Sequence, residues 1–155
     1  MPNLTIAPED PGSPDAVRLM AELSAVLAAI TGDDGLSSFG PDDVRAPRSC
    51  FLVARDDKGR AVGCGALRPL DGGAAEIKRM YAVQGGAGVG AALLAALERE
   101  ADALGYHVIR LSTRIVNTRA VSFYERHGYR LIPNFGRYKG RDESACFEKP
   151  LVRHE

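Results

Sequence analysis

A glycine-rich loop separates a strand-like segment from a helix-like segment at residues 76–98, and this junction limits the folds open to the chain. Residues 75–81 alternate between apolar and polar side chains and include Ile, Met and Tyr, which predicts a strand. A helix with one apolar face is predicted by the apolar residues that recur at every fourth position, Val89, Leu93, Leu97 and Ala101. The glycines between the two segments are Gly85, Gly86, Gly88 and Gly90.

Glycines at such a junction favour the binding of an anion. Without side chains they leave backbone N–H groups uncovered, and the first turn of the helix adds unpaired N–H donors and a partial positive charge. Phosphate is the anion most commonly bound in this way. The alternative is a loop that only turns the chain. We predict a phosphate site.

Two known nucleotide-binding motifs are alternative interpretations of this loop. Residues 86–91 fit the spacing GxGxx[GA] of dinucleotide-binding folds. Those folds place an acidic residue at the end of the next strand to hold the ribose, but residues 110–113 contain no acid. No Lys-Ser/Thr pair follows the glycines, as the P-loop of nucleotide hydrolases requires. Both motifs are therefore disfavoured.

Length and charge narrow the class of protein. The 155 residues predict a single domain over 1–155, since domains usually hold ~100–200 residues. The 20 basic and 20 acidic residues cancel, so there is no basic excess to bind nucleic acid. No apolar run approaches the ~20 residues that span a membrane, and the N-terminal residues lack the basic flank and apolar core of a signal peptide.

The three cysteines, Cys50, Cys64 and Cys146, form no CxxC pair. An odd, widely spaced set indicates reduced thiols in a cytoplasmic protein, not a disulfide framework or a zinc site, and we expect no metal. Each cysteine lies among strand-like residues, which favours a role as a small buried apolar side chain.

The order of predicted elements indicates an α+β fold with a mixed sheet. A helix should begin at Ser13-Pro14 and end at Gly32, with two apolar stripes that would be covered on two sides. A long polar loop over 32–47 follows, with at most a short helix around 41–44. Strands are predicted at 4–7, 51–55, 61–68, 75–81, 107–113, 129–132 and 144–151, and the remaining helices at 89–104 and from Asn117 to Gly128.

Four separate segments resemble the GNAT N-acetyltransferase superfamily. Residues 76–83 resemble its fourth strand, and residues 85–94 resemble its pyrophosphate loop, [QR]xxGx[GA]. Residues 117–129, NTRAVSFYERHGY, are similar to the family segment NxxAxxxYxxxGY, and residues 135–149 are similar to the ends of small bacterial members. One departure is Gly85, which stands where the family usually has Arg or Gln, although Gln84 lies one position earlier.

The resemblance implies a mostly antiparallel, seven-stranded mixed sheet with about four helices and a splay between the fourth and fifth strands. Acetyl-CoA would bind in the splay, with its pantetheine arm paired to the strand backbone and its pyrophosphate held by the glycine loop. Asn117 would bond to the arm, although helix capping explains it equally well. The residues implied to bind the cofactor are Met80, Tyr81, Ala82, Val83, Gly85, Gly86, Gly88, Val89, Gly90, Ala91, Asn117, Ala120 and Tyr124.

The resemblance also implies direct transfer of the acetyl group, which needs an acid and a base. Tyr124 matches the family's general acid for the leaving thiolate; a core tyrosine is the alternative. Glu76 is the best candidate for the base, acting through water, with an ion-paired carboxylate as the alternative. His107 and His127 are weaker candidates for this role.

The acceptor should bind between the loops at 32–47 and 136–142. Its expected lining is Phe39, Arg79, Arg114 and Tyr138; the two arginines could bind the carboxylate of an amino-acid-like acceptor or be surface charges. The implied function is acetylation of a primary amine, in a small molecule, within a ternary complex. Acetylation of a protein lysine or N-terminus, and a weakly catalytic acyl-CoA-binding regulator, are the alternatives. Many relatives are dimers, so a homodimer is possible.

Overall fold

The computed structural model describes residues 3–83 and 88–152, and within them the chain forms one seven-stranded sheet. The strand order is β1-β2-β3-β4-β5-β7-β6, and β4–β5 is the parallel pair among antiparallel neighbours. This confirms the mixed α+β fold. The strands are β1 (Thr5–Pro8), β2 (Cys50–Arg55), β3 (Ala61–Pro69), β4 (Ala74–Ala82), β5 (Val108–Arg114), β6 (Arg130–Ile132) and β7 (Ser144–Pro150).

Three α-helices lie in the described residues, α1 (Pro14–Thr31), α2 (Val89–Ala103) and α3 (Thr118–Arg126), where the resemblance implied about four. The segment between α1 and β2 forms two short 3₁₀ turns, Leu36–Ser38 and Pro41–Val44, instead of a further helix. A left-handed glycine begins the first turn, and the Gly40–Pro41 pair separates it from the second. Glycine and proline both disfavour a continuous helix, which explains the difference.

The boundaries of α1 follow from local side-chain chemistry. The Ser13 hydroxyl accepts a hydrogen bond from the Ala16 amide at 3.2 Å, and Gly32 ends the helix with a φ of 80°. Both ends agree with the prediction. The expected cover on two sides is wrong. Of the predicted stripe Leu19, Leu23, Val26 and Ile30, the first two are buried, but Val26 and Ile30 remain 44% and 43% exposed, and Val17 of the other stripe is 53% exposed. In the described part of the chain, α1 packs with one face on β3 and β4.

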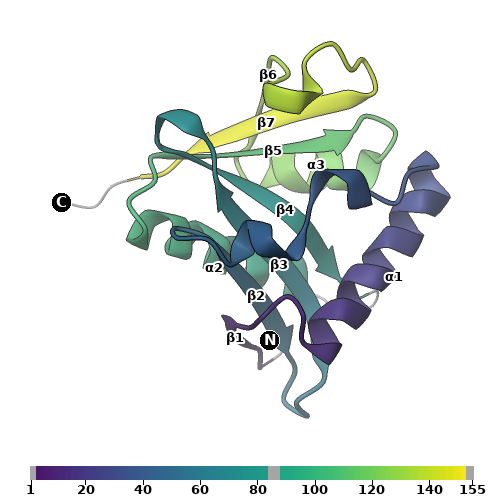
Figure 1. Cartoon of the computed structure of the whole chain (residues 1–155), viewed down its shortest axis with the longest axis vertical. Helices are drawn as coiled ribbons and strands as arrows, with labels where there is room; N and C mark the ends of the chain where they lie inside the picture. Colours follow the sequence, from purple (N-terminus) through teal and green to yellow (C-terminus); the bar gives the residue numbers. More distant parts are fainter. Residues whose placement is uncertain (1–2, 84–87, 153–155) are drawn as a thin grey trace.

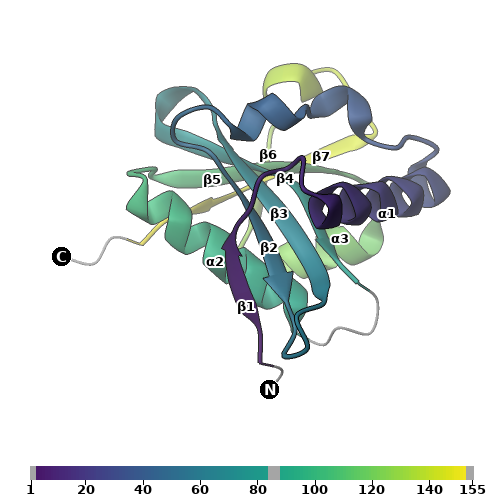
Figure 2. The ribbon, with the colours of Figure 1, turned by 60° about the horizontal axis from the view of Figure 1, so that its bottom comes forward.

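The two faces of the sheet carry separate apolar cores. The larger one lies under α2 and α3 and contains Leu93, Leu97, Tyr124 and Phe147, while the smaller one lies under α1 and contains Leu19 and Phe51. Figure 1 shows α1 and the 3₁₀ turns in front of the sheet, with α2 and α3 behind it. The turned view in Figure 2 also places α1 and α2 on opposite sides of the central strands. The sheet therefore separates two environments.

Strand β4 carries an irregularity at its centre that re-aims its side chains. Lys78 pairs with Ala66 and Tyr81 with Cys64, so that two residues of β4 oppose Gly65 alone. One of these two, Arg79, has a φ of 53°, which is uncommon for a residue with a side chain. The irregularity is a β-bulge, a feature often found beside active sites.

Strands β4 and β5 separate soon after they meet. Their pairing runs from Ala74–Val108 to Glu76–Arg110, and no further pair joins them in the described residues. Beyond that point β5 continues to pair with β7 as far as Arg114. The divergence fits the splay that the resemblance implied, and it leaves the facing backbone edges of residues 77–82 and 111–114 without a strand partner.

The cysteines are free thiols, as expected, and Cys64 and Cys146 are buried. Burial raises the pKa of the Cys50 and Cys64 thiols to about 12, so neither ionises readily. Among the helices of the described residues, none has both the length and the apolar character required to cross a bilayer.

Candidate active site

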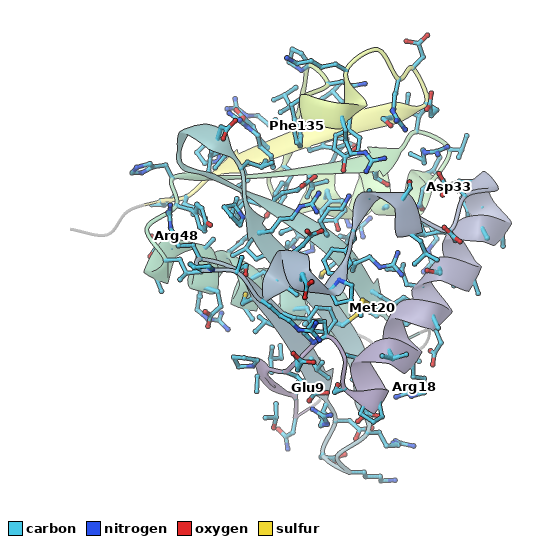
Figure 3. The ribbon with its side chains drawn as sticks, viewed as in Figure 1. Glu9, Arg18, Met20, Asp33, Arg48 and Phe135 are labelled. Carbon is cyan, nitrogen blue, oxygen red and sulfur yellow. The ribbon has the colours of Figure 1, made fainter. Side chains whose placement is uncertain are left out.

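A cavity of about 200 Å³ opens where β4 and β5 diverge. Its walls include residues 77–80 of β4 and 111–114 of β5. The C-terminal half of α1, the loop that follows it, the start of α3 and the segment before β7 complete the lining. Figure 3 shows Asp33 just beyond the end of α1, in the loop that forms part of this wall. Both predicted acceptor loops thus contribute to one cavity.

Tyr124 reaches this cavity from α3, on the face of the sheet that α2 also covers. The residue is 8% exposed, and its ring packs edge-on against Tyr129 with 5.6 Å between ring centres. Its hydroxyl makes no hydrogen bond to any residue that the structure describes. Burial raises the pKa of Tyr124 above its ordinary value, so the hydroxyl keeps its proton at neutral pH. A protonated, unbonded hydroxyl at a cavity wall is suited to donate a proton.

Glu76 lies behind the cavity wall and is not part of its lining. The residue is 1% exposed. One carboxylate oxygen accepts a 2.8 Å hydrogen bond from Arg68 Nε and lies 2.8 Å from Arg68 Nη2, and the other accepts a 3.0 Å bond from the Tyr138 hydroxyl. Arg68 is in turn paired with Asp43 at 2.7 Å. Glu76 is therefore a buried, ion-paired carboxylate, and its role as a base stays a prediction.

Lys78, which is not among the predicted site residues, connects Glu76 to the cavity. It shares a strand face with Glu76, two residues away, and its amine donates to the Tyr138 hydroxyl at 2.7 Å and to the Ser38 hydroxyl at 3.0 Å. A hydrogen-bonded chain thus runs from Glu76 through Tyr138 to Lys78 at the cavity wall. The i, i+2 spacing of Glu76 and Lys78 on one strand was the available signal.

The environment of Lys78 disfavours its charged form. Burial is the main cause, and the nearby charges of Arg68, Arg137 and Arg79 add to it, while Glu76 opposes the effect. Together they lower the pKa of Lys78 from 10.5 to about 8. About a tenth of the amine is therefore neutral at pH 7, and this fraction can accept a proton.

The predicted acceptor residues are placed differently from one another. Arg114 and Tyr138 line the cavity, and Arg114 pairs with Asp33 at 2.9 Å. Arg79 also lines it, but its guanidinium bonds to the Met20 carbonyl at 2.7 Å and the Ser24 hydroxyl at 2.6 Å, which ties β4 to α1. Phe39 is not among the lining residues; it packs against the apolar core under α1.

The start of α2 offers uncovered backbone donors. Gly88 precedes the helix with a φ of 82°, and no side chain caps the N–H groups of the first turn. An alanine methyl group at Gly90 would lie 3.4 Å from the Phe123 ring, so a side chain there would crowd α3. These features fit an anion such as a pyrophosphate. Gly85 and Gly86, predicted for the same role, lie outside the described residues.

The other predicted cofactor residues lie around the splay. Met80, Asn117 and Ala120 line the cavity, and the Asn117 side chain accepts a 3.3 Å bond from the Ala120 amide as the cap of α3. Tyr81, Ala82 and Val83 continue β4 toward α2, and Val89 and Ala91 lie in the first turn of α2. The described members of the predicted set thus surround the splay from both faces: Tyr81 and Val83 pack against the core under α1, whereas the core under α2 and α3 holds Met80, Ala82, Val89, Ala120 and Tyr124.

Residues 19–129 match the model of the Acetyltransferase (GNAT) family, which is more than half of the chain. The chain is a member of the GNAT acetyltransferase family. The bacterial relative named IAA acetyltransferase, from Azospirillum brasilense, is 34% identical over 97% of this chain and 100% of its own length. This GNAT protein also resembles a Klebsiella pneumoniae structure assigned as an acyl-CoA N-acyltransferase, with 33% identity, a TM-score of 0.81, and coverage of 96% of this chain and 98% of that one.

A more distant GNAT structure shows the same fold with a ligand. The Elizabethkingia anophelis acetyltransferase, solved with acetyl-CoA bound, is 20% identical, with a TM-score of 0.69 over 96% of this chain and 99% of that one. The family uses acetyl-CoA as the acetyl donor. The fold and the enzyme class inferred from the sequence are therefore confirmed.

Proposed function

We propose that this GNAT enzyme transfers an acetyl group from acetyl-CoA directly to the primary amine of a small molecule. One observation carries the proposal: a single cavity joins Tyr124, on the face with α2 and α3, to Lys78 and Tyr138, on the face with α1. Donor and acceptor could therefore meet in the splay from opposite faces of the sheet. The cavity volume of about 200 Å³ favours a small acceptor over a protein chain.

The donor side is formed by backbone. Acetyl-CoA supplies an activated thioester when it is bound. The unpaired edge of β4 from Met80 to Ala82 would hold the pantetheine arm by strand-like hydrogen bonds, and the uncovered N–H groups at Val89 and Gly90 would hold the pyrophosphate. The homodimer expected from relatives stays a prediction.

Catalysis by this site needs two proton movements. The acceptor amine attacks the thioester carbonyl in its neutral form, the carbon–sulfur bond breaks, and Tyr124 donates its proton to the departing sulfur. The proton released by the acceptor passes to the neutral side-chain amine of Lys78. This amine is held in place by the Tyr138 hydroxyl, which is itself bonded to the buried carboxylate of Glu76. Glu76 would thus act through Tyr138 and Lys78.

The test is a two-stage measurement on the purified chain. Acetyl-CoA at ~100 times its dissociation constant should stabilise the fold by about 2.7 kcal/mol, and the melting temperature should rise accordingly. Free CoA thiol should then appear only when an amine is also present, and initial-rate lines at several amine concentrations should intersect, as expected for a ternary complex. A melting temperature unchanged by acetyl-CoA, or thiol release without any amine, would contradict the proposal.

A further inference from the structure

The cavity is lined by an excess of cationic side chains. Among its described lining residues, the only acid is Asp33, whereas the cations are Lys78, Arg79, Arg114, Arg137 and Arg141. The whole chain, in contrast, has equal numbers of basic and acidic residues. The positive charge is thus a local property of the cavity.

Four of these cations, all except Arg114, have no carboxylate partner in the described residues; Arg79 bonds to the Met20 carbonyl and the Ser24 hydroxyl. Arg137 bonds to the carbonyl and hydroxyl oxygens of Ser37, at 2.9 and 3.5 Å, and Lys78 bonds to hydroxyl groups alone. The Arg141 guanidinium makes no hydrogen bond or ion pair to a described residue. Elsewhere in the chain, Arg45, Arg55, Arg68 and Arg110 each pair with a carboxylate. Arg99 and Arg130, on the surface, also form no ion pair with a described residue, so the distinctive feature is that four such cations line one cavity.

The position of the cations assigns them to the acceptor. Lys78 lies on the strand face opposite the apolar side chain of Ile77, which packs in the core under α2 and α3. Arg114 bonds to the loop that follows α1, and Arg137 bonds to the same loop. The uncapped start of α2, which suits the donor's phosphates, belongs to the other face. Positive charge on the α1 side would act on a molecule that enters from that side.

Resting on the function proposed above, we propose that the acceptor is an anionic amine, a small molecule that carries a carboxylate beside its primary amine, as an amino acid does. Arg137 and Arg141 would bind the carboxylate, since planar guanidinium groups match carboxylates with paired hydrogen bonds. The amine would then point toward Lys78 inside the splay. Polycationic amines would be repelled by the same side chains.

The first test compares matched acceptors at saturating acetyl-CoA. Each α-amino acid is assayed by thiol release beside its amide, which keeps the amine and side chain but lacks the negative charge, and beside spermidine as a polycation. For the best acid, kcat/KM should exceed that of the amide by about tenfold or more, the effect of one good ion pair. Equal or faster acetylation of amides or spermidine would overturn the proposal.

The second test locates the charge effect. The double variant Arg137→Gln/Arg141→Gln should reduce the acid-to-amide ratio of kcat/KM by about tenfold, mainly through the KM of the acid. The matched control is Lys139→Gln, an exposed cation of the same loop that does not line the cavity, and it should leave the ratio unchanged. An equal loss for acid and amide in the double variant would show a structural role and overturn the proposal.

The two proposals can fail separately. If acetyl-CoA raises the melting temperature and amines of every charge are acetylated alike, only the acceptor class is wrong. If no amine is acetylated, the proposed function fails, and the acceptor class fails with it. Binding of the product gives a readout without turnover: an N-acetyl amino acid should raise the melting temperature of the protein with CoA more than its uncharged amide does. No such difference would again overturn the anionic-acceptor proposal.

Discussion

The Tyr138 hydroxyl donates a 3.0 Å hydrogen bond to the Glu76 carboxylate in the protein interior, and this contact joins the fold to the candidate active site. The same hydroxyl accepts a bond from Lys78 at the cavity wall. Since the second oxygen of Glu76 is held by Arg68, the carboxylate has defined partners on both sides.

Glu76→Gln should destabilise the fold because Arg68 loses a buried partner. The expected loss in the free energy of unfolding is about 3 kcal/mol, at the lower end for broken buried pairs, since Asp43 still compensates part of the charge. Urea denaturation measures it. The control is Arg60→Gln, which breaks the pair with Asp56; the Arg60 side chain is 70% exposed, and little change is expected. Equal effects of the two changes would show that the Glu76 pair does not stabilise the fold.

Tyr124→Phe should leave acetyl-CoA binding intact and reduce kcat by about 100-fold, because the departing sulfur loses its proton donor. Binding is followed by the shift in melting temperature and turnover by thiol release. Tyr129→Phe is a suitable control, since its hydroxyl bonds to Glu98 at 2.9 Å and does not line the cavity. Unchanged turnover in Tyr124→Phe would remove this residue from the mechanism.

The titration of Lys78 should appear in the pH dependence of stability. Burial lowers its pKa from 10.5 to about 8, so between these values the unfolded chain holds a proton that the folded protein has lost. The contribution of Lys78 to stability therefore rises with pH across this window. Between pH 7 and pH 10, wild type should gain about 2 kcal/mol relative to Lys78→Met in urea denaturation.

The comparison with the variant is needed because other groups titrate in the opposite sense. Burial raises the pKa of the Cys50 and Cys64 thiols, so their contribution to stability falls above the ordinary thiol pKa. These effects cancel in the difference between Lys78→Met and wild type. A difference that does not change with pH would mean that the pKa of Lys78 is not lowered in the folded protein.

Gly63→Ala, in β3, should distort the neighbouring strand β4, which leads to the proposed donor site. The added methyl group would lie 2.8 Å from the Tyr81 carbonyl oxygen and 2.7 Å from Leu93, and a backbone atom cannot move aside easily. We expect a loss of about 2 kcal/mol of stability and weaker acetyl-CoA binding. Gly40→Ala is the control, with no atom within 4 Å and an ordinary extended backbone, and it should be tolerated. Denaturation and ligand-induced melting shifts measure both; a neutral Gly63→Ala would argue against tight packing there.

Much of the fold could be predicted because its signals are local. The cap at Ser13, the end of α1 at Gly32 and the cap at Asn117 depend on neighbours within a few residues, and the structure confirms each. The two apolar stripes of α1 suggested cover on two sides, but Val17, Val26 and Ile30 are exposed, since periodicity shows which residues share a face and not whether another element covers it.

The candidate site was harder to predict because its contacts are distant in sequence. The partners of Lys78, Ser38 and Tyr138, lie 40 and 60 positions away. Its pKa is lowered mainly by burial, which arises only in the folded chain. Arg79, expected at the acceptor, lines the cavity, but it lies at the bulge in β4 and its guanidinium bonds to Met20 and Ser24 of α1. No local pattern revealed the bulge.

The proposed placement of donor and acceptor on opposite faces of the sheet would have an evolutionary consequence. Substitutions in the segment with Arg137 and Arg141 alter the α1 side of the cavity, while the backbone of β4 and the start of α2 stay as they are. A duplicated gene could therefore acquire a new specificity through a few changes in one short segment, without first losing the use of its shared donor.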